Sequence, residues 1–171
     1  MAAPMKKTLT LALLATMLAF LIPAVAQAAT TPTSTETQVI KLVNKERTKR
    51  GLAPVKFKSS LTYAARAHSS EMARRGKLTH TSANDNSFAQ RLIKYSYKRS
   101  GYRSWSAGED IARAKKGSLY ATPTVIVSSW MKSSAHRAVI LKSKFRDVGV
   151  GIRTSRSGMR YFTLDMGRRI R

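Results

Sequence analysis

The sequence predicts a layered α+β domain, with several helices first and an antiparallel pair of strands near the end of the chain. Two observations favour this class. Apolar residues recur every three or four positions over the segments before residue 141, which is helical spacing. After that point the period changes, because Val148, Val150 and Ile152 alternate with glycine or arginine, and a polar turn at 155–158 leads into a second run at Met159–Met166.

Residues 1–28 have the three parts of a secretory signal peptide. Lys6 and Lys7 give a positive start, an apolar run follows from about residue 9 to 22, and Ala26-Gln27-Ala28 forms a cleavage site before Ala29. The alternative is an uncleaved membrane anchor, but the apolar run is shorter than the ~20 residues that span a bilayer. We therefore expect a secreted, extracellular product that is not transmembrane.

The first helix is expected after a short linker at residues 29–37, which is rich in threonine, serine and proline. Thr35, with Gln38 three residues later, forms a capping-box pattern, and Gly51 ends the helix. A second helix follows Ser59-Ser60 and ends at Gly76, with His68 on its apolar face.

The middle of the chain alternates loops with short helices. Thr79–Asn86 is expected to be a polar loop, and Phe88 with the apolar residues after it marks a third helix. Ser100–Gly108 again has the composition of a loop. Thr122-Pro123, a cap followed by proline in the first turn, starts a fourth helix, and Ala138–Leu141 suggests one more turn.

Length and charge limit the class of protein further. About 140 residues remain after cleavage, which suffices for one domain with its own core and fits the absence of cysteine. The formal net charge is +24, and +22 without Lys6 and Lys7, so the surface attracts polyanions whatever the fold. The basic residues are scattered, without an RNA-binding or zinc-finger motif. We expect association with anionic cell-wall polymers or lipid headgroups by charge, and no specific nucleic acid.

Only eight acids and three histidines could carry chemistry. Glu46 and Glu71 each precede an arginine by four residues, so both have ion-pair partners on a helix. Glu109-Asp110 is different, because this acidic doublet stands in a basic region, either as a loop cap or as a functional pair. His68 is expected to be a hydrogen-bonded core histidine.

His80 and His136 are the remaining histidines, one in a polar loop and one at a helix end. Two histidines and a carboxylate can form a three-ligand metal site with an open position. The separations of 29 residues from His80 to Glu109 and of 27 from there to His136 match no local metal motif. Spacing alone therefore leaves the metal site open.

An ordered set of motifs over about residues 38–167 resembles the bacterial branch of the CAP superfamily, which includes cysteine-rich secretory proteins, antigen 5 and pathogenesis-related proteins. No single motif is decisive, but their order in a domain of this size is specific. The motifs are Val43-Asn44 with Glu46-Arg47, His80-Thr81-Ser82, Gly108–Ala112, Trp130–Arg137 with Ile140-Leu141, and Val148–Gly151. The resemblance implies a CAP domain (SCP-like) at 38–167 followed by a basic tail at 168–171.

The resemblance also implies a three-layer α–β–α sandwich with one cleft, which family members line with two histidines and two acids and which can hold a divalent metal. His80 and His136 match the histidines, and Glu109 matches the first acid. The second acid falls near Ser133, which is not acidic here, and Asp110 stands where the family commonly has asparagine. The expected cleft therefore contains these five residues, with His80 and His136 as ligands of a metal such as zinc.

Family members have been linked to lipid or sterol binding, to proteolysis and to ligand-mimicking interactions. We interpret the chain as a monomeric extracellular binding module, rather than an enzyme, whose cleft takes a divalent metal or a small hydrophobic or peptide ligand. The alternative is a metal-dependent hydrolase that uses His80, Glu109 and His136 as its catalytic residues. A third interpretation is a wall-associated structural protein held by charge alone.

Overall fold

A computed structural model describes residues 31–84 and 86–171, and the predicted signal peptide lies outside them. Four strands form one sheet in the order β1-β3-β4-β2. The strands are β1 (Lys56–Phe57), β2 (Ser104–Lys115), β3 (Asp147–Thr154) and β4 (Met159–Ile170). The helices are α1 (Ser34–Thr48), α2 (Ser59–Arg75), α3 (Phe88–Lys94), α4 (Pro123–Lys132), α5 (Ser134–Ile140) and the short 3₁₀ helix η1 (Leu119–Ala121). None of the helices in this part of the chain is long and apolar enough to cross a membrane.

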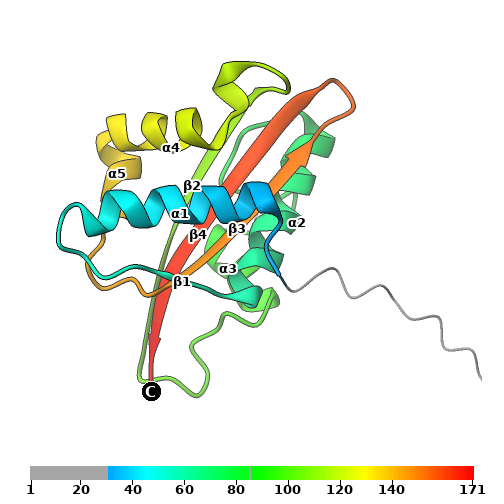
Figure 1. The fold of residues 1–171 in the computed structure, drawn as a ribbon. Coiled ribbons are helices and arrows are strands. Elements are labelled where there is room, and N and C mark those ends of the chain that lie inside the picture. Colours follow the sequence, from blue (N-terminus) through cyan, green and yellow to red (C-terminus); the bar gives the residue numbers. More distant parts are fainter. Residues whose placement is uncertain (1–30, 85) are drawn as a thin grey trace, which may run out of the picture.

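Helices cover both faces of the sheet, which makes the predicted α–β–α sandwich (Figure 1). On one face, Val39 and Val43 of α1 and Trp130 of α4 pack in a core with apolar residues of β3 and β4. On the other face α2 lies directly on β3. A Cβ atom at Gly149 would be 2.3 Å from the backbone of α2, and one at Gly151 would be 2.2 Å from it, so only glycine permits this approach.

The terminal hairpin confirms the predicted change to strand spacing and extends it. β3 and β4 pair antiparallel along their length, as predicted. β4 continues to Ile170, where Arg168, Arg169 and Ile170 pair with the first residues of β2. The expected basic tail is therefore mostly strand, because its backbone groups find partners on β2.

β2 corrects the expectation of a loop around Ser100–Gly108 and at the acidic doublet. Its twelve residues pair with β4 over their full length. The segment contains serine, glycine, alanine and charged residues, so its composition carries little strand signal. This segment is therefore a strand because it pairs with the distant strand β4, not because of its local sequence.

The first helix begins earlier than its expected cap at Thr35. Thr33 is the N-cap, its side chain accepts from the Glu36 backbone at 3.3 Å, and the Glu36 carboxylate accepts from the Thr33 backbone at 2.8 Å. Arg66 of α2 also donates to both oxygens of Glu36, at 2.9 and 2.6 Å. This ion pair between α1 and α2 favours Glu36, not Gln38, as the third helical residue, so the expected linker is already helical from Ser34.

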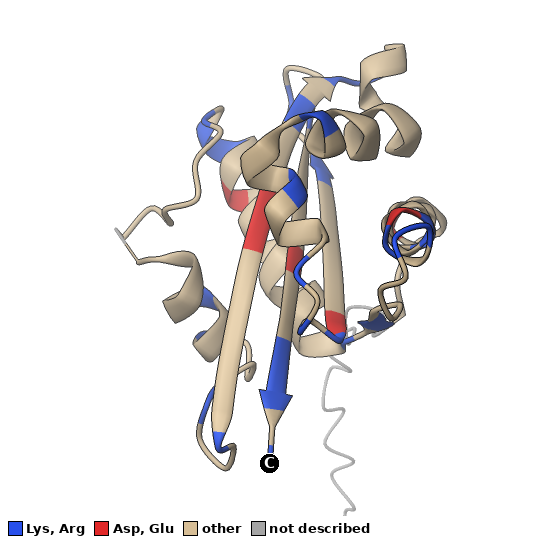
Figure 2. Cartoon of the chain, turned by 90° about the vertical axis from the view of Figure 1, so that its left-hand side faces the viewer, with Lys and Arg blue, Asp and Glu red and all other residues tan. Residues whose placement is uncertain are grey.

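Lysines and arginines lie on helices, strands and connecting segments alike, whereas acidic residues are few (Figure 2). Arg47 and Arg91 are exceptions, because both are buried. Arg47 is fully buried and donates to the carbonyl oxygens of Ala53, Ile140 and Phe145 at 3.0, 2.6 and 3.2 Å. It therefore ties the segment after α5 to the end of α1.

Candidate functional site

The predicted site residues come from three parts of the fold that meet at β2, an edge strand of the sheet. His80 lies in the connection between α2 and α3, Glu109 lies in the middle of β2, and His136 lies on α5. Glu109 is directly paired with Asp165 of β4, which is paired with Gly149 of β3. Since Gly149 faces α2, the Glu109 side chain lies on the α2 face of the sheet.

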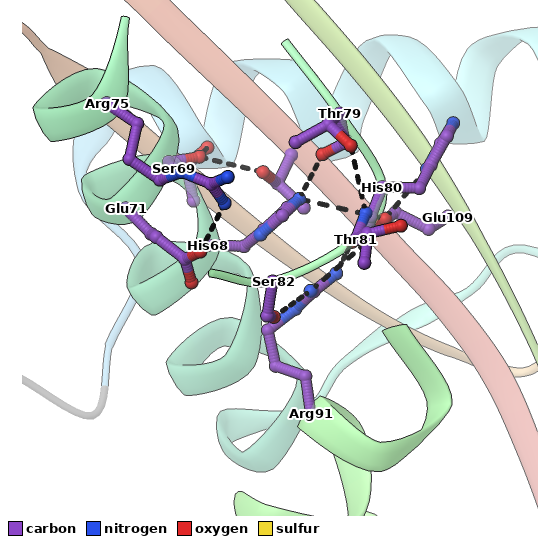
Figure 3. A network of polar contacts seen from close by, with 12 residues as sticks. His68, Ser69, Glu71, Arg75, Thr79, His80, Thr81, Ser82, Arg91 and Glu109 are labelled. Carbon is purple, nitrogen blue, oxygen red and sulfur yellow. Dashed lines mark hydrogen bonds and ion pairs between the residues drawn. The ribbon is translucent and has the colours of Figure 1, made fainter. Parts of the chain in front are cut away.

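Glu109 is held by two partners, one on each carboxylate oxygen (Figure 3). Its Oε1 atom lies 2.8 Å from Nδ1 of His80, and its Oε2 atom accepts from the guanidinium of Arg91. Burial alone would raise the pKa of Glu109, but the His80 hydrogen bond and the Arg91 charge outweigh it and lower that pKa. Glu109 is thus ionised, and its acceptor role makes Nδ1 of His80 the donor and leaves Nε2 of His80 free.

The buried arginine of this network was not predicted. Arg91 is 5% exposed, and its Nη1 atom donates to Ser82 Oγ at 2.9 Å and to the His80 carbonyl at 3.3 Å. The capping box between Ser87 and Gln90 starts α3 just before it and so fixes the direction of the helix. Arg91 therefore holds both the carboxylate that orients His80 and the backbone of His80 itself.

His68 is fully buried and hydrogen-bonded, as expected from its place on the apolar face of α2. Its Nε2 atom lies 2.7 Å from the Thr79 carbonyl and 4.0 Å from Oε1 of Glu109. Burial lowers the pKa of His68, so the neutral ring donates from Nε2 to Thr79. This contact fixes the residue before His80 against α2 (Figure 3).

Asp165 is a second buried acid that sequence reasoning missed. It has no exposed surface, and burial together with the negative charge of Glu109 raises its pKa well above the usual range. Neither carboxyl oxygen of Asp165 has a hydrogen-bond partner among the described residues, so Asp165 is a neutral buried acid on the strand next to Glu109. One negative charge, that of Glu109, therefore remains and is balanced by Arg91.

The other predicted cleft residues lie around this centre. His136 is half-buried on α5, and burial and the charge of His80 lower its pKa, so its ring is neutral at pH 7. Ser133 is the N-cap residue of α5, but its hydroxyl makes no capping hydrogen bond. His80 is the most open member, with 52% of its side chain exposed.

Asp110 does not share the environment of Glu109. Adjacent strand residues point to opposite faces, and Asp110 is paired with Leu164, on the side of the sheet that faces α1 and α4. It is 1% exposed, and neither carboxylate oxygen has a hydrogen-bond partner among the described residues. Burial, with the charge of Glu109, raises the pKa of Asp110 to about 8. Asp110 is therefore a buried neutral acid and not part of an open cleft.

The side chains that could coordinate a metal ion at this site are too few to fill its coordination sphere, so they fit only an open metal site. Across residues 31–84 and 86–171, no group of three or more histidine, cysteine, aspartate or glutamate side chains is arranged to hold a metal ion. Both oxygens of Glu109 are already used, which leaves Nε2 of His80 and the ring of His136 as nitrogen donors. Two imidazoles, one of them oriented by a carboxylate, fit a zinc ion whose remaining positions go to water or a ligand.

Relatives among curated proteins come from Bacillus subtilis. The uncharacterized protein YkwD is 35% identical over 138 residues, which cover 75% of this chain and 49% of YkwD. The uncharacterized membrane protein YlbC is 30% identical over 121 residues, which cover 70% of this chain and 32% of YlbC. The chain thus spans about half the length of one relative and about a third of the other.

Solved structures share the fold at low identity. An extracellular protein from Bacillus anthracis that contains an SCP domain has a TM-score of 0.67 and 22% identity, over 78% of this chain and 40% of that one. An outer surface protein from Borrelia burgdorferi has a TM-score of 0.65 and 17% identity, over 80% and 96% of the two chains. The sequence profile of the cysteine-rich secretory protein family, CAP, matches residues 40–166. The chain therefore belongs to the CAP family, although it contains no cysteine.

Proposed function

We propose that this protein is an extracellular binding module that takes its ligand at His80 and His136, directly or through a divalent metal such as zinc. The observation that carries the proposal is the double engagement of Glu109, by His80 on one oxygen and by Arg91 on the other. A carboxylate in this position orients the imidazole and fixes its proton on Nδ1. Nε2 of His80 then points a lone pair out of a half-exposed side chain.

The same contacts argue against the alternative, a hydrolase in which Glu109 is the general base. A base must have a free lone pair within hydrogen-bond reach of the attacking water. The Glu109 side chain is only 1% exposed, and a guanidinium covers the oxygen that His80 leaves free. Asp165 is fully buried and protonated, so it cannot take the role of that base. Catalytic zinc sites have three protein ligands beside their open position, and only two nitrogen donors are left here, so the site suits binding better than catalysis.

Several features support an extracellular location for this binding activity. The signal-peptide pattern of residues 1–28 favours export, and two fold relatives are an extracellular protein and an outer surface protein. The high positive charge favours attachment to anionic cell-wall polymers or lipid headgroups. A small hydrophobic or peptide ligand that donates or accepts at His80 is compatible with the open position. We propose that the protein acts as a monomer.

Zinc titration by calorimetry tests the proposal on the purified protein. We expect His80→Ala and His136→Ala each to abolish binding, because each removes one of two protein ligands. Glu109→Gln should weaken binding by about 10- to 100-fold, the usual effect of losing a group that orients a ligand. Binding should also fall below about pH 6, where protons compete for imidazole.

The control is Arg50→Gln, because the exposed Arg50 lies just after α1 and pairs with Glu46 of that helix, not with a residue of the histidine site. It should leave zinc binding unchanged. Zinc affinity that survives both histidine substitutions would refute the site. Zinc-dependent cleavage of a peptide or ester by the wild type, lost in a folded Glu109→Gln variant, would refute the binding module and establish the hydrolase.

A further inference from the structure

A groove of about 1070 Å³ lies on the α2 face of the fold, away from the histidine site. One wall is the last part of α2, and the other is the end of β3 with the turn that leads into β4. His80, Glu109 and His136 do not line it. The groove is lined by Ala67, Ser70, Glu71, Ala73, Arg74, Arg75, Gly76, Tyr95, Arg153, Thr154, Ser155, Arg156 and Ser157.

The charge of this groove is strongly positive. Arg74 and Arg75 come from the helix wall, and Arg153 and Arg156 come from the turn wall. The single acid of the lining, Glu71, is already paired with Arg75 at 3.1 Å. Arg74, Arg153 and Arg156 have no carboxylate within ion-pair distance in the described part of the chain. Three guanidinium groups therefore remain available to a ligand.

The surrounding backbone keeps the two walls in place. Arg113 of β2 donates to the Gly76 carbonyl at 3.1 Å, which offsets the negative end of α2 next to the groove. In the turn, Ser155 donates from its backbone to the Met159 carbonyl at 2.7 Å. The Lys116 backbone also donates to the Gly158 carbonyl at 2.8 Å, which fixes the turn against the end of β2. The arginines thus project from a rigid frame, so binding costs little ordering of the main chain.

The geometry favours phosphate over carboxylate. Arginines approach from two walls, and the non-bridging oxygens of a phosphodiester diverge tetrahedrally, so one group can accept from both sides. A planar carboxylate presents its two oxygens to one side. Hydroxyls of Ser70, Thr154 and Ser157 add donors along the lining. The volume matches the upper end of small-ligand pockets, which suits several linked units better than one ion.

We propose that this groove binds the backbone of an anionic polymer of phosphodiester-linked units. Arg74, Arg153 and Arg156 contact successive phosphates, and Tyr95 lines the groove at its α3 side. Glycerol phosphodiester is the chemistry that such a polymer shares with a phosphatidylglycerol headgroup. The groove would then be one defined polymer-binding site on a surface that otherwise attracts polyanions diffusely. Binding there would be independent of ligand binding at His80.

The test measures binding of a fluorescent glycerol phosphate oligomer of about ten units by anisotropy, at several salt concentrations. We expect Arg153→Gln combined with Arg156→Gln to weaken binding at least tenfold at 0.1 M salt. Because two phosphate contacts are lost, the slope of log affinity against log salt should become shallower by about one to two. The matched control combines Lys41→Gln with Lys45→Gln, which removes two exposed charges from α1 on the opposite face. It should change affinity by less than about threefold.

The results of these measurements distinguish binding in the groove from diffuse attraction to the charged surface. Equal losses in the groove and control variants would overturn the proposal, because the attraction would then be diffuse. Equal binding of polyglutamate of the same charge would overturn the preference for phosphate. Binding only to phosphatidylglycerol vesicles, with the same loss in the groove variant, would support the groove and assign the lipid as the source of the phosphate. Unchanged zinc binding in the groove variant shows that the histidine site is intact.

Discussion

Asp110→Asn is expected to stabilise the protein at neutral and alkaline pH. Asp110 is a buried acid whose two oxygens find no hydrogen-bond partner among the described residues, in a layer that it shares with Leu164 and Val150. An unpaired negative charge in that layer is costly, which is why burial raises the pKa of Asp110 from 3.8 to about 8. Asparagine has the same shape without the charge.

The size of the effect follows from the two pKa values. Below pH 3.8 Asp110 is protonated in both the folded and the unfolded chain, so its contribution to stability does not change with pH. Between that value and about 8 only the unfolded chain releases the proton, so stability falls as pH rises. Each pH unit is worth about 1.4 kcal/mol, which gives an upper limit of about 6 kcal/mol over this range. Local relaxation reduces this, so we expect a gain of about 2 to 5 kcal/mol for Asp110→Asn at pH 8.

Urea unfolding of both proteins at pH 4.5, 6 and 8 measures this effect. The two free energies of unfolding should differ by only about 1 kcal/mol at pH 4.5 and should separate progressively above it. Contributions of Glu109 and Asp165 are present in both proteins and largely cancel. A difference that is the same at every pH would mean that Asp110 does not change protonation in this range. A variant less stable than the wild type at pH 8 would show that Asp110 has a partner that the geometry does not reveal.

Three further outcomes follow from packing and charge. Arg47→Met should lower the free energy of unfolding by about 2 to 5 kcal/mol in urea titrations, because buried carbonyls of Ala53, Ile140 and Phe145 lose their donor, whereas the exposed Arg50→Met should cost less than 1 kcal/mol. Gly149→Ala should yield little folded protein by circular dichroism, since the added Cβ would lie 2.3 Å from the α2 backbone; a native spectrum with unchanged stability would contradict the close contact of α2 and β3. His68→Ala should reduce stability and loosen Thr79 and His80, seen as faster amide exchange at 79–82, and unchanged exchange there would mean that His68 does not position His80.

Local sequence signals predicted most of the helices but not the edge strand β2. Thr122-Pro123 starts α4 as expected, because a cap followed by proline acts within one turn. Gly76 ends α2 with a positive φ of 68°, as its position after the apolar stripe suggested. β2 was missed because its pairing partner is β4, some fifty residues away in sequence. Strand formation there depends on contacts that no local window contains.

The same distinction applies to the site. His80, Glu109 and His136 were found through their motifs, since each stands in a short segment of recognisable sequence. Arg91 and Asp165 carry no such signal: one is an arginine on a short amphipathic helix, and the other is one acid within a strand. Their roles depend on the register that pairs Glu109 with Asp165 and on the direction of α3. The one available hint was in the sequence itself, where Ser87 and Gln90 have the spacing of a capping box just before Arg91.

The few acids of this basic chain explain why the site is built as it is. Three of the eight, Glu109, Asp110 and Asp165, are buried in adjacent rows of the sheet. If all three were ionised, the single guanidinium of Arg91 could not balance them, and the raised pKa values of Asp110 and Asp165 express that conflict. Protonation of these two leaves one carboxylate, that of Glu109, opposite one arginine. Glu109 is then fixed as an acceptor, His80 must donate to it from Nδ1, and only Nε2 remains for a ligand. The protonation of two buried acids therefore favours the tautomer of His80 that carries its proton on Nδ1 and has a lone pair on Nε2.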